Sequence, residues 1–136
     1  MLARFWGVRG SIPTPMTHAE MRDKAFNLLK GASGVNLDDN AHIDAYLDSL
    51  GPVELGPVGG NSSCVELRTP ESLLVFDAGS GLRELGLSLM KQEFGKGGGE
   101  VSIFLSHTHW DHIMGFPFFI PAFVPGNKIT FYSCHD

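Results

Sequence analysis

One stretch decides the fold: Val101-Ser102-Ile103-Phe104-Leu105-Ser106-His107-Thr108-His109-Trp110-Asp111-His112. Residues 101–105 have the length and apolar character of a buried strand, which leads directly to three imidazoles and a carboxylate. His107 and His109 are two residues apart, so in an extended chain their side chains lie on the same side and can bind one ion. If the chain then turns into a helix, Asp111 and His112 can face a second ion. The spacing therefore predicts a centre for two divalent metal ions.

The alternative for such a cluster is a purely structural role. One histidine at a strand end is usually a hydrogen-bonded residue of the scaffold, but three histidines and an aspartate this close would be costly to bury without a cation. Zinc is the expected ion for a histidine-rich site with a carboxylate, and manganese or iron would fit the same ligands. Two ions roughly 3.5–4 Å apart can share a hydroxide and hold the oxygens of a reacting phosphoryl or acyl group. The pattern therefore indicates hydrolysis.

Hydrophobic periodicity on both sides of this stretch predicts further strands and helices. Further strands are expected over residues 2–8, around Val65 and Leu67, over residues 73–76 and over residues 129–132. Thr17 and Glu20 form a capping-box pattern that begins one helix, and residues 39–50 fit a second. A third helix is expected to begin after Ser80, which would be its N-cap. Strands and helices in this order predict an α/β (α+β) fold.

Composition argues against two kinds of partner. The formal net charge is -5 and no run of Lys or Arg occurs, so no long nucleic acid is expected to bind. No stretch approaches about 18 uninterrupted apolar residues and no basic leader pattern opens the chain, so we expect no membrane partner and a cytoplasmic location. Cys64 and Cys134 lack the spacing of a disulfide framework or a zinc ribbon. Both are expected to be small buried residues.

Four residues outside the histidine stretch are candidates for supporting the metals or contacting a substrate: Asp77, Asn61, Ser62 and Arg9. Asp77 ends an apolar strand and could orient a metal-binding histidine through a hydrogen bond or cap the helix after Gly79. Asn61 and Ser62 could contact a substrate phosphate, although ordinary turn chemistry is the favoured interpretation. Arg9 could pair with a phosphate, but a solitary arginine is more often a surface charge.

The histidine stretch resembles the H-x-H-x-D-H signature of the metallo-β-lactamase superfamily. Other segments are similar to its cyclic phosphodiesterase branch, which includes phosphoribosyl 1,2-cyclic phosphate phosphodiesterases and lies near ribonuclease Z. These segments are residues 5–15 (FWGVRGSIPTP), 59–64 (GGNSSC) and 76–86 (FDAGSGLRELG). The resemblance covers most of the chain and leaves a helical insertion at about residues 17–51.

The resemblance implies an αββα sandwich, of which this chain would form the N-terminal half. It also implies that His107 and His109 bind the first metal and that Asp111 and His112 bind the second. The superfamily completes its site with a histidine on each metal and a bridging aspartate, all from later strands.

Only His135 and Asp136 offer such groups after the motif, and they lie too close behind it to be assigned these positions. We therefore expect residues 1–136 to be a single, incomplete domain. Its site would be completed in a homodimer or by a complementing C-terminal half.

The expected function is that of a metal-dependent hydrolase, a phosphodiesterase acting on a small cyclic or nucleotide-like phosphoester. Asp111 and His109 are the catalytic candidates, and Asp111 would help to orient the nucleophile. One alternative is hydrolysis of another ester, such as a thioester or lactone, and another is a noncatalytic piece that binds metal incompletely. A di-iron oxidoreductase on the same fold is disfavoured, since that branch typically has Glu where this chain has His109.

Overall fold

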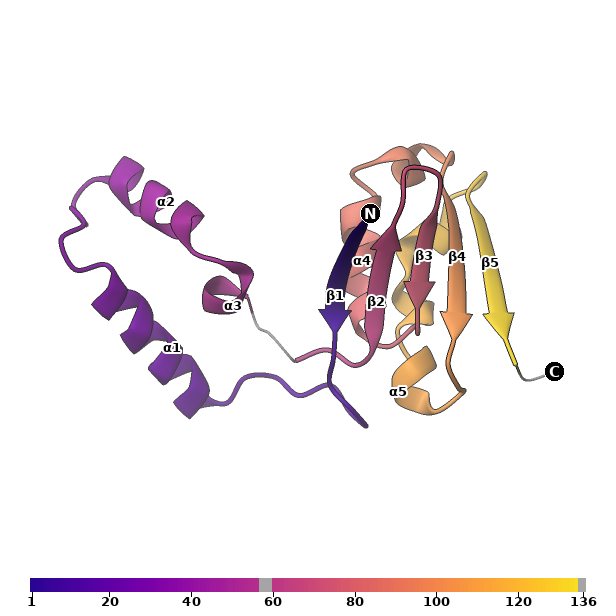
Figure 1. Cartoon of the computed structure of the whole chain (residues 1–136), viewed down its shortest axis with the longest axis horizontal. Coiled ribbons are helices and arrows are strands. Elements are labelled where there is room, and N and C mark those ends of the chain that lie inside the picture. Colours follow the sequence, from indigo (N-terminus) through magenta and orange to yellow (C-terminus); the bar gives the residue numbers. More distant parts are fainter. Residues whose placement is uncertain (57–59, 135–136) are drawn as a thin grey trace. The chain divides into compact units, whose positions relative to one another are not determined.

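The computed structural model describes residues 1–56 and 60–134, and of Pro52 and Val53 only the backbone. By its internal contacts the chain divides into two compact units, Met1–Thr14 together with Gly59–Asp136, and Pro15–Val58. The first unit carries a five-stranded sheet and the second is helical (Figure 1). The candidate ligands His135 and Asp136 lie outside the described residues.

The sheet of the first unit has the strand order β1-β2-β3-β4-β5. Its strands are Leu2–Gly7, Cys64–Arg68, Leu73–Phe76, Glu100–Leu105 and Lys128–Ser133. β1, β2 and β3 are antiparallel neighbours, whereas β3, β4 and β5 are parallel. Parallel neighbours need a crossover, and α4 (Gly81–Leu89) lies in the connection between β3 and β4. Because parallel strands end at the same edge of a sheet, the residues that follow β3 and β4 lie close together.

The core of this unit lies between the sheet and α4. Its fully or almost fully buried side chains are Leu82, Leu85 and Leu89 of α4 with Val75, Val101 and Ile103 of the sheet. Three short 3-10 helices contact α4, at Glu93–Lys96 (η1), Phe116–Phe118 (η2) and Ile120–Phe123 (η3). Gly86 leaves room for the buried ring of Phe119, since a Cβ on Gly86 would lie 3.0 Å from Cδ2 of that ring. The predicted α/β fold is confirmed.

An aromatic row occupies the other face of the sheet. Phe76, Phe104 and Tyr132 hold matching positions on β3, β4 and β5, with neighbouring ring centroids 5.5 and 4.6 Å apart. Phe76 is 42% exposed and Tyr132 is 48% exposed. A sheet with one packed face and one partly exposed apolar face fits one half of a layered sandwich.

The second unit contains the two predicted helices and one more. They are α1 (His18–Gly31), α2 (Asn40–Ser49) and α3 (Pro52–Leu55). The capping box is confirmed, because the Thr17 hydroxyl accepts from the Glu20 amide and the Glu20 carboxylate accepts from the Thr17 amide. Pro52 begins α3, because proline is well tolerated at the first helical position. None of the described helices is long and apolar enough to span a membrane.

Two expectations about single residues are wrong. Ser80 precedes α4 but makes no side-chain cap, because it already has helical φ and ψ of -62° and -20°. Its hydroxyl instead accepts from the Ser62 amide at 3.0 Å and donates to Asn61 Oδ1 at 2.9 Å. Cys134 is exposed, since it lies beyond the end of the edge strand β5, whereas Cys64 is buried as expected.

The two cysteines should react at very different rates. Burial, assisted by the carboxylates of Asp77 and Glu66, raises the pKa of the Cys64 thiol to about 12. Because the thiolate is the reactive form, a disulfide reagent at mildly alkaline pH should modify one thiol of the native chain and the second only in denaturant. Absorbance of the released thiol measures both phases. If native Cys134→Ser still reacted quickly, the burial of Cys64 would be contradicted.

Candidate metal centre

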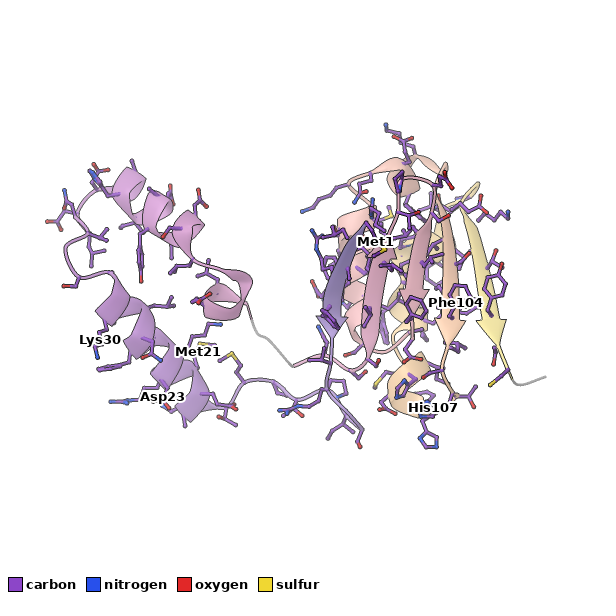
Figure 2. The ribbon with its side chains drawn as sticks, in the orientation of Figure 1. Met1, Met21, Asp23, Lys30, Phe104 and His107 are labelled. Carbon is purple, nitrogen blue, oxygen red and sulfur yellow. The ribbon has the colours of Figure 1, made fainter. Side chains whose placement is uncertain are left out.

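The histidine stretch lies at the edge of the sheet where β3 and β4 end. After β4 the chain passes through residues 106–109 into α5 (Trp110–Ile113), which is the predicted turn into a helix. Figure 2 shows His107 beyond the end of β4. The Ala78 amide donates to the His112 carbonyl at 2.7 Å, and the Gly115 amide donates to the Ala78 carbonyl at 2.9 Å. These bonds attach α5 to the segment that follows β3.

The three imidazoles form one cluster. The ring centroids of His107 and His109 are 4.5 Å apart, and those of His107 and His112 are 4.0 Å apart. Asp111 adjoins them, with Oδ2 at 3.4 Å from His112 Nε2. The structure therefore brings together the four residues that the sequence singles out as metal ligands.

Asp77 supports this cluster from the end of β3. One carboxylate oxygen accepts from the Ser106 amide at 2.9 Å and from the Ser106 hydroxyl at 2.7 Å. The other accepts from the Ser63 hydroxyl at 3.0 Å and lies 2.8 Å from His112 Nδ1. Burial alone would raise the pKa of Asp77, but hydrogen bonds from Ser106, His112 and Ser63 hold it below its usual range. Of the two roles considered for Asp77, the structure shows the hydrogen bond to a histidine.

These contacts set the tautomers of two imidazoles. His112 donates its Nδ1 proton to Asp77. The Ser106 hydroxyl donates its proton to Asp77, so its oxygen accepts from His107 Nδ1 at 3.1 Å. In the neutral form of both rings, Nε2 then carries the free lone pair. A histidine whose other nitrogen is held in this way is oriented for metal binding.

Asp111 is held from a distant part of the chain. Its Oδ2 accepts from the backbone amide of Ser11 at 2.9 Å, although the two residues are 100 positions apart. Burial alone would raise the pKa of Asp111, but the amides of Ser11 and of Asp111 itself, with His112 and His107 nearby, hold it below its usual range. Sequence reasoning missed Ser11 and the role of Ser106. Ser106 directly precedes the motif and could have been found, whereas nothing local identifies Ser11.

The remaining candidates lie in or beside the turn at residues 60–63. Ser62 is fully buried and its hydroxyl accepts from the Ser80 amide at 2.9 Å, so it stabilises the turn. Asn61 accepts from the Ser80 hydroxyl through Oδ1, which agrees with the favoured turn interpretation. Arg9 is exposed and its backbone amide donates to the Asn61 carbonyl at 2.9 Å. Among the described contacts, none joins these three side chains to the histidine cluster.

The donor atoms of the cluster, imidazole nitrogen and carboxylate oxygen, are of the chemical types that bind divalent cations. In the neutral form of His112, with its Nδ1 proton given to Asp77, Nε2 is an acceptor that lies 3.4 Å from the acceptor Oδ2 of Asp111. Two such acceptors need a proton or a cation between them, and nitrogen and carboxylate donors suit zinc. Within residues 1–56 and 60–134, however, no three His, Cys, Asp or Glu side chains are placed to hold an ion by themselves. The described residues by themselves therefore form no complete three-ligand metal site.

Histidines and an aspartate gathered where parallel strands end define a class of metal-binding α/β proteins. The family model described as the metallo-beta-lactamase superfamily matches residues 55–128, which is more than half of the chain. The chain belongs to the metallo-β-lactamase superfamily. Comparison with curated proteins and with solved structures found no match. Membership indicates a metal-dependent hydrolase, and the five-stranded sheet with its helices is part of the superfamily's α/β fold.

Proposed function

We propose that this chain is a metal-dependent hydrolase of phosphodiester bonds in a small cyclic or nucleotide-like ester. The observation that carries the proposal is the cluster of oriented imidazoles beside Asp111. The superfamily match supports hydrolysis. Residues 5–15 and 76–86, which resemble cyclic phosphodiesterases, favour a phosphodiester as the substrate.

His107, His109, Asp111 and His112 would hold the ions, for which we propose zinc, with manganese or iron as alternatives. Bound divalent ions supply activation of water and stabilisation of the charge that develops on the phosphoryl oxygens. Asp77 holds the His112 ring through Nδ1, so that Nε2 points away from the scaffold and toward Asp111. Asp111, itself held by the Ser11 amide, would orient the attacking water.

We also propose that ligands from a second copy of the chain or from a complementing C-terminal half complete the centre. The support is that no three described side chains can hold an ion alone. Elemental analysis of the dialysed chain, combined with light scattering, tests this proposal. Near two ions per chain in a dimer would support completion by a second copy. Near zero ions in a monomer would support a complementing half, whereas two ions in a monomer would contradict both.

The activity proposal predicts metal-dependent hydrolysis that requires His109. With zinc or manganese added, His109→Ala should lower the rate on an aryl phosphodiester by on the order of a hundredfold or more, because a bound metal contributes several kcal/mol to the transition state. His18→Ala is the matched control, since His18 is exposed on α1. A chelator should abolish the rate and added metal should restore it.

Rates on a thioester and a lactone separate the alternative hydrolases. Faster turnover of either one than of the phosphodiester would reassign the substrate. The proposal fails if the metal-loaded protein hydrolyses no phosphodiester, or if His109→Ala leaves its phosphodiesterase rate unchanged.

A further inference from the structure

The backbone at Ser11 has an unusual conformation in contact with the metal centre. Its φ is 68°, a left-handed value that serine rarely adopts. Among the described residues, the non-glycine residues with positive φ are Ser11 and Asp77. The Ser11 amide donates to Asp111 of the histidine motif, and Asp77 accepts from the amide of Ser106, which directly precedes the motif. Strained backbone that persists at such a place is commonly part of a functional site.

Hydrogen bonds anchor the loop of residues 9–13 on both sides. Where the loop begins, the amides of Val8 and Arg9 donate to the Asn61 carbonyl at 3.0 and 2.9 Å. After the loop, the Thr14 amide donates to the Gly60 carbonyl at 2.8 Å. The left-handed turn at Ser11 is therefore held between two fixed points.

The turn that anchors this loop is itself attached to the start of α4. The Ser62 amide donates to the Ser80 hydroxyl at 3.0 Å, and the Ser80 amide donates to the Ser62 hydroxyl at 2.9 Å. The Ser80 hydroxyl in turn donates to Asn61 Oδ1. A continuous series of hydrogen bonds thus runs from the buried start of α4 through Asn61 to the loop, and from the loop to Asp111.

We propose that the loop of residues 9–13 is a positioning element of the metal centre, which acts through the Ser11 backbone amide on the Asp111 carboxylate. A carboxylate ligand with one oxygen held by an amide presents its remaining lone pairs in a fixed direction. This role explains why the loop keeps a disfavoured conformation. The inference rests on the proposed function, because it assumes that Asp111 is a metal ligand.

Ser11→Val and Ser11→Asn form a matched pair of test variants. Both retain the backbone amide, and Ser11 is exposed, so neither side chain meets a packed core. Valine rarely adopts positive φ, whereas asparagine does so readily, so only valine should turn the amide away from Asp111. We expect zinc affinity to fall roughly tenfold in Ser11→Val and to stay within about twofold in Ser11→Asn. Calorimetric titration of the full chain measures the affinity, and thermal unfolding checks that each variant is folded.

Hydrogen exchange of the Ser11 amide gives a second readout, without metal. The amide should be protected in the wild-type chain and should exchange roughly tenfold faster in Asp111→Ala. If Ser11→Val bound zinc as tightly as wild type, or if the Ser11 amide exchanged equally fast in Asp111→Ala and wild type, this inference would fail but the proposed function would stand. A wild-type chain that binds no zinc would contradict completion of the centre by a second copy, and the exchange comparison, which needs no metal, would then decide the inference.

Discussion

Gly115→Ala should destabilise the protein by about 3 kcal/mol or more, because the added methyl group has no space. A Cβ on Gly115 would overlap the carbonyl oxygen of Gly79 and lie 2.7 Å from its carbonyl carbon. Both are backbone atoms that cannot rotate away. If the chain at Gly115 moved away from the chain at Gly79, the 2.9 Å hydrogen bond from the Gly115 amide to the Ala78 carbonyl would also break. Urea unfolding followed by fluorescence measures the loss.

Gly10→Ala is the matched control for this prediction. A Cβ on Gly10 would meet no atom within 4 Å, so its stability should stay within about 0.5 kcal/mol of wild type. Because α5 carries Asp111 and His112, displacement of this segment in Gly115→Ala should also weaken zinc binding at the proposed site. If Gly115→Ala were as stable as Gly10→Ala, the close contact between α5 and the end of β3 would be refuted.

Asp77→Ala should lower the free energy of unfolding by about 3 kcal/mol, since bonds to a charged acceptor are worth more than neutral ones. The substitution leaves the Ser106 amide, two serine hydroxyls and His112 Nδ1 without their acceptor. Alanine also tolerates the observed φ of 63° less well than aspartate does. Denaturant unfolding at neutral pH measures the change.

Asp77→Asn separates the charge of this residue from its shape. Asparagine tolerates positive φ and keeps one acceptor oxygen, so a loss of about 1–2 kcal/mol is expected. Zinc affinity should fall more than tenfold in Asp77→Ala, because the His112 ring is no longer oriented, and less in Asp77→Asn. Stability equal to wild type in Asp77→Ala would contradict the role of this carboxylate.

The helices and strands that were predicted correctly are each marked by a sequence pattern only a few residues long. Thr17 and Glu20 are three positions apart, and their capping box is present as predicted. The apolar run at residues 101–105 forms β4 with one added residue, and the chain turns into α5 directly after it. The side chain of Ser80 is different, because its position in the sequence suits a cap while its partners, Asn61 and Ser62, come from another turn.

The sequence by itself determined the α/β fold, the superfamily and the side chains that we propose as metal ligands, since each depends on residue types at short spacing. The tertiary structure alone decided which other groups hydrogen-bond to these proposed ligands. Asp77 meets His112 because β3 and β4 are parallel and end at one edge. Ser11 meets Asp111 across 100 positions because the N-terminal loop is tied to the turn at residues 60–63. Such contacts have no local pattern, because they arise only when the sheet and its crossover have formed.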